Sequence, residues 1–135
     1  MDLFKTFKTD KSKETEGVWV QIGVTERIRV ARANNVRFEE AQVRKGQRYK
    51  MAAKAKSIPE DIWNSMFIEL VAEYILLDWE GMTVDGGEPY PYSVDNAKRA
   101  LEMKDFLNLV MSYASDMAHF KEELDQGTEK NSVRP

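Results

Sequence analysis

The stretch that decides the fold is SIPEDIWNSMFIELVAEYILLDWEG, residues 57–81. Large apolar side chains recur through it at the spacing of one helix face. They are Trp63, Phe67, Leu70, Tyr74 and Leu77. Ser57 and Glu60 have the spacing of a capping box, and Pro59 suits a first turn because its missing N–H costs nothing there. The pattern predicts one helix over residues 58–79, which ends before Gly81.

The end of this stretch is more apolar than one helix face requires. Residues 74–77 are all large and apolar or aromatic, so they cover every side of a turn. A helix packed on one side needs an apolar stripe only about 100° wide. Two explanations remain open: the segment lies in the centre of the core, or part of its surface is left for another chain.

Upstream, the segments GVWVQIG (17–23) and RIRVAR (27–32) alternate apolar and polar side chains, which is typical of strands. The residues between them, 23–26, have the length of a hairpin loop and begin with a glycine. The sequence therefore predicts a β-hairpin over residues 17–32. Because a two-stranded hairpin is not stable alone in water, it must pack on the helices.

Three further segments predict helices, over residues 36–54, 93–102 and 105–124. The first has a thin apolar stripe and many basic residues, and Ser93 can cap the second. The third has apolar residues in a heptad pattern, at Phe106, Val110, Tyr113, Met117, Phe120 and Leu124. The predicted fold is mainly α with an N-terminal β-hairpin, a small single-domain bundle of about four helices.

The polar ends frame this domain. Residues 1–16 are rich in lysine apart from Leu3, Phe4 and Phe7, and we expect a flexible N-terminal arm. Residues 125–135 are predicted to be a flexible C-terminal tail, which leaves 17–124 as a single domain of ordinary size. No segment has the length and apolarity of a signal sequence or a membrane span, so we expect a cytoplasmic protein without a membrane partner.

Charge is unevenly distributed along the chain. Residues 27–56 contain ten Lys or Arg against two Glu, a formal charge of +8, whereas residues 57–135 contain six basic and sixteen acidic residues, a charge of −10. The two parts can attract each other within one molecule or between copies. Nucleic acid binding is less expected, because few aromatics lie among the basic residues and Glu39 and Glu40 would repel phosphate.

The residue types that most catalytic sites need are scarce. The chain has no cysteine and one histidine, His119, and it contains neither a glycine-rich phosphate loop nor a nucleophile elbow. We therefore expect a binding protein rather than an enzyme, with no catalytic residue, no metal and no cofactor.

A succession of short motifs resembles a known family. The motifs are RVARANNVRF (29–38), LLDWEG (76–81), YSVDNA (92–97) and ASDMAHF (114–120). In this order the chain resembles, over about residues 17–124, the tail assembly chaperones of long-tailed, non-contractile (siphovirus-type) bacteriophages.

The resemblance implies a late phage protein that works in the host cell cytoplasm during tail morphogenesis and is absent from the mature virion. Such chaperones bind the tape measure protein, keep it soluble and help to recruit tail tube subunits. Because many copies serve one tape measure, self-association into homo-oligomers is expected. In many relatives a frameshifted, longer form contacts the tail tube protein.

We expect the partner-binding and oligomer-binding residues in two groups. The apolar group comprises Trp63, Phe67, Tyr74, Leu77 and Trp79, and the basic group comprises Arg27, Arg29, Arg44 and Arg48. Two alternatives to a chaperone stay open at this point. They are a structural phage protein, at the head–tail junction or in tail completion, and a small nucleic-acid-binding regulator.

Overall fold

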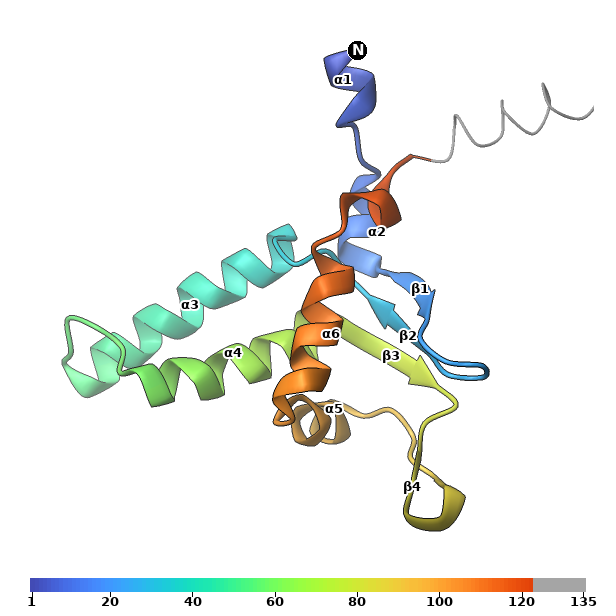
Figure 1. Cartoon of the computed structure of the whole chain (residues 1–135). Helices are drawn as coiled ribbons and strands as arrows, with labels where there is room; N and C mark the ends of the chain where they lie inside the picture. Colours follow the sequence, from blue (N-terminus) through green and yellow to red (C-terminus); the bar gives the residue numbers. More distant parts are fainter. Residues whose placement is uncertain (123–135) are drawn as a thin grey trace, which may run out of the picture.

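The computed structural model describes residues 1–122, which form a mainly helical single domain with a small antiparallel sheet (Figure 1). The predicted N-terminal hairpin is confirmed, with β1 (Val18–Gln21) paired to β2 (Arg27–Val30). A third strand, β3 (Leu76–Glu80), pairs with the other edge of β2, so the strand order is β1-β2-β3. The hairpin is thus anchored by a strand that follows it by almost fifty residues.

The decisive stretch changes conformation at Ile75. Helix α4 (Glu60–Tyr74) ends there and β3 begins one residue later, so the prediction of one helix over 58–79 is wrong at its end. The expected capping box is also wrong, because Pro59 is the N-cap residue and no side chain caps the helix. Ile75 and Leu76 are buried at the junction between helix and sheet. This burial explains why the run at residues 74–77 is more apolar than one helix face requires.

The register of the sheet separates its two faces. Ile28 pairs with Trp79 and Val30 with Leu76, and these four side chains are buried. A register shift between Arg29 and Val30 lets β3 carry one extra residue there. Gly81 then ends β3 at φ +82°, and a Cβ on it would lie 2.6 Å from the backbone oxygen of Thr25, so only glycine fits this turn.

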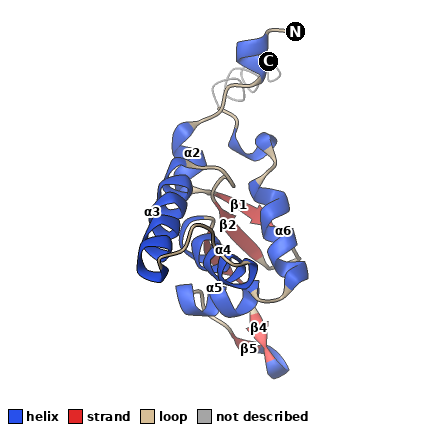
Figure 2. Cartoon of the chain, turned by 90° about the vertical axis from the view of Figure 1, so that its left-hand side faces the viewer, coloured by secondary structure: helices blue, strands red, loops and turns tan. Residues whose placement is uncertain are grey.

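Helices α4 and α6 (Lys104–Ala114) contact the sheet, and α5 (Val94–Leu101) packs against both of them (Figure 2). The predicted cap of α5 is confirmed, because the Ser93 hydroxyl accepts a hydrogen bond from the Asn96 N–H at 3.0 Å. The largest fully buried side chains are Phe120, Ile28, Leu70, Ile75, Leu76, Leu101, Val30, Val71 and Val110.

Helix α3 (Val36–Ala53) packs beside α4, and the two helices project away from the sheet (Figure 1). The buried Asn35 fixes the base of this pair. Its carbonyl oxygen accepts from the Phe38 N–H at 3.0 Å, and its amide group donates to the backbone oxygens of Arg32 at 2.7 Å and Tyr74 at 3.1 Å. One side chain therefore ties the start of α3 to the end of α4.

The final helix is shorter than expected. Helix α6 ends at Ala114, and a 3₁₀ helix, η2 (Met117–Phe120), follows it. Asp116 starts η2 by accepting a hydrogen bond from the Ala118 N–H at 3.0 Å. The prediction of one helix over 105–124 is therefore wrong beyond Ala114. Leu124 and the predicted tail at 125–135 lie outside the described residues.

Much of the expected N-terminal arm is structured. It contains α1 (Leu3–Thr6) and α2 (Lys11–Glu16). The Asp10 N–H donates to the Phe120 oxygen at 2.8 Å, and Thr9 forms a β-bridge with Lys121. Residues 9–16 are therefore attached to the domain, and the correction to a loosely tethered arm follows from these bonds. Only the segment with α1 extends beyond the body (Figures 1 and 2).

A small second hairpin lies at the end of the molecule opposite α1 (Figure 1). It consists of β4 (Thr83–Val84), the 3₁₀ turn η1 (Asp85–Gly87) and β5 (Glu88–Pro89). Trp79 connects it to the core. The indole N–H donates to the Tyr90 oxygen at 2.8 Å, and the two rings stack with centroids 5.8 Å apart.

Candidate functional site

A hollow of about 420 Å³ lies between the second hairpin and helices α5 and α6, and we name it the β4–α5 groove. Aromatic and methionine side chains dominate its wall, and Arg99 and Glu102 supply charge. Its lining consists of Trp79, Met82, Thr83, Val84, Tyr90, Arg99, Ala100, Glu102, Met103 and Phe106. Such a wall of flexible and flat apolar groups suits an apolar segment more than a small polar ligand.

A second hollow, of about 360 Å³, lies between α3 and α4. Because these two helices form a helical hairpin, we name it the hairpin groove. It has an apolar centre with charged residues on its rim. Its lining consists of Lys45, Arg48, Tyr49, Ala52, Ile62, Ser65, Met66 and Glu69. Lys45 is fixed across it, because its amino group lies 3.3 Å from Glu69 Oε2 and 3.7 Å from Glu73 Oε1.

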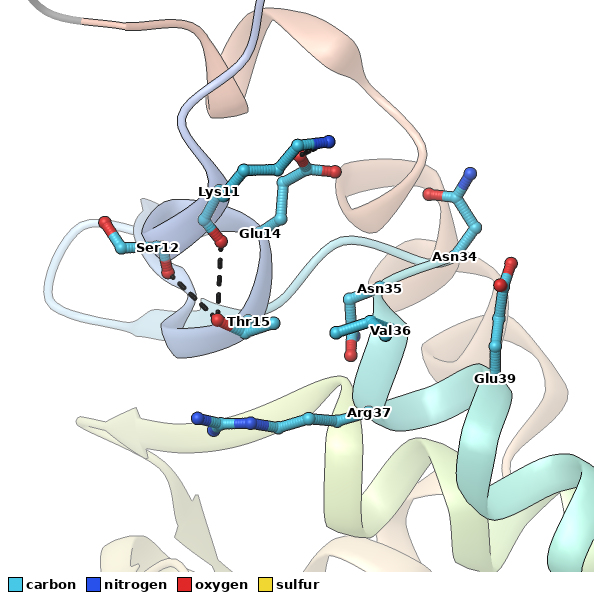
Figure 3. A pocket seen from close by; sticks show the side chains of 9 residues that line it. All are labelled: Lys11, Ser12, Glu14, Thr15, Asn34, Asn35, Val36, Arg37 and Glu39. Carbon is cyan, nitrogen blue, oxygen red and sulfur yellow. Dashed lines mark hydrogen bonds and ion pairs between the residues drawn. The ribbon is translucent and has the colours of Figure 1, made fainter.

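A third hollow, of about 540 Å³, lies between α2 and the start of α3 (Figure 3). It is polar, with a lining of Lys11, Ser12, Glu14, Thr15, Asn34, Asn35, Val36, Arg37 and Glu39. Several of these groups already serve local structure. The Thr15 hydroxyl, for example, is within hydrogen-bond distance of the Lys11 and Ser12 oxygens, at 3.4 and 3.5 Å. This hollow does not offer the apolar surface that the sequence led us to seek.

The five predicted apolar residues do not form one surface. Trp63 and Phe67 lie in a row of rings on the α3–α4 pair, where Phe67 meets Trp63 at 6.3 Å and Phe38 at 6.1 Å between centroids. Tyr74 lies half-buried at the end of α4. Leu77 is half-buried in β3, and Trp79 is only 5% exposed. Trp79 therefore forms the floor of the β4–α5 groove rather than an exposed contact.

The four predicted arginines are also separated. Arg27 lies on the outer face of the sheet, 2.6 Å from Glu80 and 4.1 Å from the centroid of the Trp19 ring. Arg29 lies on the same face and donates to the Glu16 oxygen at 2.6 Å. On α3, Arg44 donates to the Tyr74 hydroxyl at 3.4 Å, whereas Arg48 lines the hairpin groove.

Part of the basic segment is neutralised within the molecule. Arg27 pairs with Glu80, Arg32 with Glu14, and Lys45 with Glu69 and Glu73. By contrast, six exposed basic residues of α3 and its following loop form no ion pair with the part of the chain that is described. They are Arg37, Arg44, Arg48, Lys50, Lys54 and Lys56. The exposed, unpaired charge of the basic segment therefore lies on α3 and on the loop that follows it.

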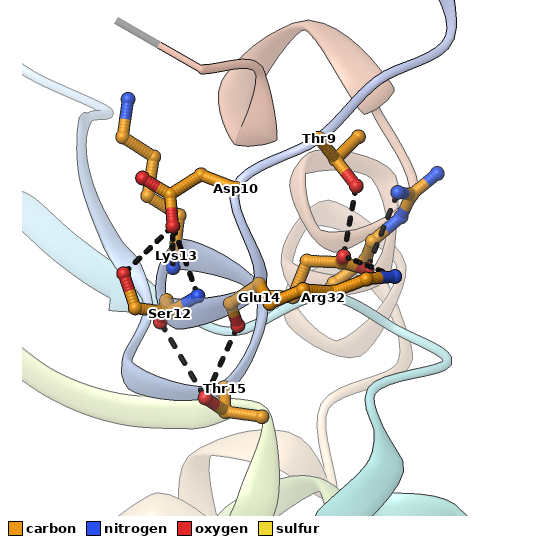
Figure 4. A network of polar contacts seen from close by, with 8 residues as sticks. Thr9, Asp10, Ser12, Lys13, Glu14, Thr15 and Arg32 are labelled. Atoms are coloured by element: carbon orange, nitrogen blue, oxygen red, sulfur yellow. Dashed lines mark hydrogen bonds and ion pairs between the residues drawn. The ribbon is translucent and has the colours of Figure 1, made fainter. Parts of the chain in front are cut away.

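Titratable groups show which contacts are electrostatic (Figure 4). Burial opposes ionisation of Glu14, but the Thr9 hydroxyl at 2.8 Å, Lys11 and Arg32 outweigh it and hold the pKa of this carboxyl below its ordinary value. On the sheet, the Arg27–Glu80 hydrogen bond lowers the pKa of Glu80 and raises that of Arg27.

Other kinds of site were also sought within residues 1–122. In this range, no group of three His, Cys, Asp or Glu side chains is placed to hold a metal ion. The helices of the same range are too short or too polar to span a bilayer.

Most residues of the two grooves were missed by sequence reasoning. Met82 and Met103 flank separate elements, and only the fold brings them beside Phe106. In the hairpin groove, Tyr49 comes from α3 and Ile62 and Met66 from α4, and only the packing of the two helices brings them together. The sequence signal for this groove was an excess of apolar residues on α4. They lie on two neighbouring faces of the helix, and α3 is too polar to cover both faces.

Comparison with known proteins gives one result. No curated protein and no solved structure matches the chain. A family model described as "YdaY prophage protein" matches residues 33–131, which include α3, α4, the sheet strand β3, the second hairpin and α6. With most of its length matched, this chain belongs to the YdaY family of prophage proteins.

Proposed function

We propose that this prophage protein is a tail assembly chaperone that binds the tape measure protein and keeps it soluble. The observation that carries the proposal is the hairpin groove, an open hollow lined by apolar and charged side chains on a projecting pair of helices. The succession of motifs from residue 29 to residue 120, which resembles the chaperones of siphovirus-type phages, supports the same function.

The chemistry of the hairpin groove suits an amphipathic helix. Tyr49, Ile62 and Met66 offer apolar contacts to one face of such a helix, and methionine adapts to varied side chains. Arg48 on the rim can pair with an acidic residue of the client, since no carboxylate of the described residues neutralises it. A groove of this kind would shield apolar segments of a long helical client without requiring one fixed sequence.

The wider function includes five further elements. We propose that the protein acts by binding rather than catalysis, needs no cofactor, and works in the host cell cytoplasm without entering the mature virion. It associates with copies of itself along the tape measure protein. It also helps to recruit tail tube subunits, through a frameshifted longer form where one is made.

Co-expression with the tape measure protein of the same prophage tests the client. The expected result is a soluble tape measure protein that co-purifies with several copies of this chain. In the variant Ala52→Glu, a charged side chain enters the hairpin groove, and recovery of soluble tape measure protein should fall. The matched control is Ala53→Glu, a neighbouring exposed residue that does not line the groove. If the tape measure protein aggregates equally with and without the unmodified chain, the proposal is wrong.

Purified particles test the competing structural function. A head–tail or tail completion protein stays in the particle, whereas a chaperone leaves it. Mass spectrometry of particles induced from the prophage should therefore detect the tube and tape measure proteins but not this chain. Its presence at stoichiometric amounts would assign it to the virion.

A further inference from the structure

The two walls of the hairpin groove carry opposite charge, and the wall formed by α3 is basic. Arg44 and Arg48 are one helical turn apart, so they lie on the same side of α3. Both are exposed, and neither forms an ion pair with a carboxylate of residues 1–122. Arg44 donates to the Tyr74 hydroxyl at 3.4 Å, but this neutral group does not cancel its charge. The α3 wall therefore offers two uncompensated positive charges.

The wall formed by α4 is acidic. Glu69 and Glu73 are one turn apart and share a single cation, because the Lys45 amino group lies 3.3 Å from Glu69 Oε2 and 3.7 Å from Glu73 Oε1. One lysine cannot cancel two carboxylates, so the three groups together keep one negative charge. The Lys45 side chain is 23% exposed and that of Glu69 is 46% exposed. A partner therefore meets the carboxylate more readily than the lysine on this wall.

Between the two walls the groove is apolar. Tyr49, Ile62 and Met66 line it, and all three are half-buried. Nucleic acid does not match this arrangement, because its phosphates offer nothing apolar to these side chains and are repelled by Glu69 and Glu73. A helix with an apolar stripe, acidic residues along one flank and basic residues along the other matches all three parts.

We propose that the hairpin groove binds a client helix whose apolar stripe has one acidic and one basic flank, and that the flanks fix the direction of this helix. The acidic flank lies against Arg44 and Arg48. The basic flank lies against Glu69 and Glu73. Turning a helix end for end, with its stripe still in the groove, exchanges its flanks, so only one direction is complementary. The inference rests on the proposed function and names the class of client segment that the groove accepts.

Designed helical peptides test the preference for charge. Three probes of roughly 20 residues, long enough to form a helix, share one leucine stripe. The mixed peptide has glutamate on one flank and lysine on the other, the acidic peptide has glutamate on both, and the basic peptide has lysine on both. Fluorescence anisotropy with the full chain should show at least roughly threefold tighter binding of the mixed peptide, since exposed ion pairs each contribute modestly. Added salt should reduce this difference.

A spin label tests the direction of the bound helix. The chain has no cysteine, so Ser57→Cys gives one labelling position, in the loop that joins α3 to α4 at one end of the groove. The mixed peptide and a twin with exchanged flanks each carry a fluorine tag at the N-terminus. The label should broaden the NMR signal of the tag in one peptide and not in its twin, because exchanged flanks reverse the helix.

Charge reversal on the α3 wall completes the test. Arg44→Glu combined with Arg48→Glu makes both walls acidic, so the preference should move from the mixed to the basic peptide. The control combines Lys50→Glu with Lys56→Glu, which changes the net charge equally at two exposed residues outside the groove lining. This control should keep the preference for the mixed peptide. Circular dichroism checks that both double variants are folded.

Four outcomes would overturn the inference. They are no binding or equal binding of the three peptides, the same direction for both twins, an unchanged preference after reversal of Arg44 and Arg48, or displacement of the mixed peptide by duplex DNA. Oligomers of the unmodified chain that dissociate on this reversal, without peptide, would assign the groove to a second copy and also overturn it.

The chaperone proposal and this inference can fail separately. If the tape measure protein stays soluble and Ala52→Glu abolishes this effect, but the peptides show no preference, only the inference is wrong. If the peptides are discriminated as expected while the tape measure protein aggregates, the groove binds such a helix of another protein, and the chaperone proposal is wrong.

Discussion

The two halves of residues 60–80 both carry large apolar side chains but lie in different environments. No residue of α4 from Glu60 to Glu69 is buried, although Ile62, Trp63, Met66 and Phe67 lie there. From Leu70 onward the same run supplies much of the core, with Leu70, Val71, Ala72, Ile75, Leu76 and Trp79 all buried. The second half runs directly into β3, which pairs with β2 inside the core, whereas the first half belongs to the projecting α3–α4 pair. An apolar pattern thus predicts that a helix face packs against something, but it does not identify the element or the partner that covers this face.

The largest expected effect separates the two halves directly. Ile75→Ala removes a fully buried side chain from the junction of α4 and β3, and should lower the free energy of unfolding by about 2–5 kcal/mol. Ile62→Ala, the same chemical change on the half-exposed part of α4, should cost less than half as much. Urea unfolding followed by tryptophan fluorescence measures both. Equal losses would show that the projecting helices are part of one continuous core.

The second prediction concerns the ion pair between Glu14 and Arg32, which lies beside the buried Phe120. Glu14 holds Arg32, whose guanidinium carbon lies 5.9 Å from the centroid of the buried Phe120 ring. Because the pKa of Glu14 is lowered in the folded state, its stabilisation is present above the ordinary glutamate pKa and is lost as the pH falls through the lowered value.

Glu14→Gln should therefore lower the free energy of unfolding by about 1–3 kcal/mol at neutral pH, since hydrogen bonds to a charged group are lost. The difference between the variant and the unmodified chain should shrink as the pH falls below 4.5, the ordinary value for this carboxyl. Urea titrations at a series of pH values measure it. A difference that is constant with pH would mean that the charge of Glu14 contributes nothing.

The third prediction tests the switch from helix to strand. The Tyr92 hydroxyl donates to the Leu76 oxygen at 2.8 Å and lies 3.1 Å from the Ala72 oxygen, so it joins the last turn of α4 to β3. Tyr92→Phe should lower the free energy of unfolding by about 0.5–1.5 kcal/mol, the usual net value of one hydrogen bond. Hydrogen exchange should accelerate first at the α4–β3 junction. Faster exchange confined to the tip of the α3–α4 pair would contradict this assignment.

Local patterns predicted the elements that depend on local interactions. The β-hairpin follows from alternation, and α5 from its Ser93 cap. The strand β3 did not follow, because LLDWE becomes a strand by pairing with β2, almost fifty residues earlier. Its sequence signal was the continuous apolar run at residues 74–77, which is typical of a buried strand as well as of a helix. The end of α6 was missed because the heptad pattern continues through the Asp116 break.

The candidate site was predictable in kind but not in place. A surplus of apolar and basic residues was foreseeable, and Arg48, which we predicted to bind a partner, lines the hairpin groove. Trp79 and Arg27 were assigned to the same role by residue type, yet one is buried and the other is paired with Glu80 on the sheet. Exposure and pairing depend on contacts between distant segments, which composition and spacing do not reveal.

The smallest expected effect tests whether the hairpin groove contributes to the stability of the fold. Ala52 lines the groove and Ala53 lies outside it, and both are exposed at the end of α3. Glutamate forms helices nearly as well as alanine, so Ala52→Glu and Ala53→Glu should each change the free energy of unfolding by less than about 0.5 kcal/mol. Thermal unfolding of both variants measures it.

A clear loss of stability in Ala52→Glu alone would mean that the groove is a packing contact of the folded chain, closed by its own side chains in solution. The first half of α4 would then contribute to the packing of the fold, as the second half does. Equal, near-zero effects in both variants would instead establish that the groove can be filled without disturbing the core. In that case, a loss of soluble tape measure protein in Ala52→Glu but not in Ala53→Glu reports on binding, because the two chains share the same net charge and the same stability.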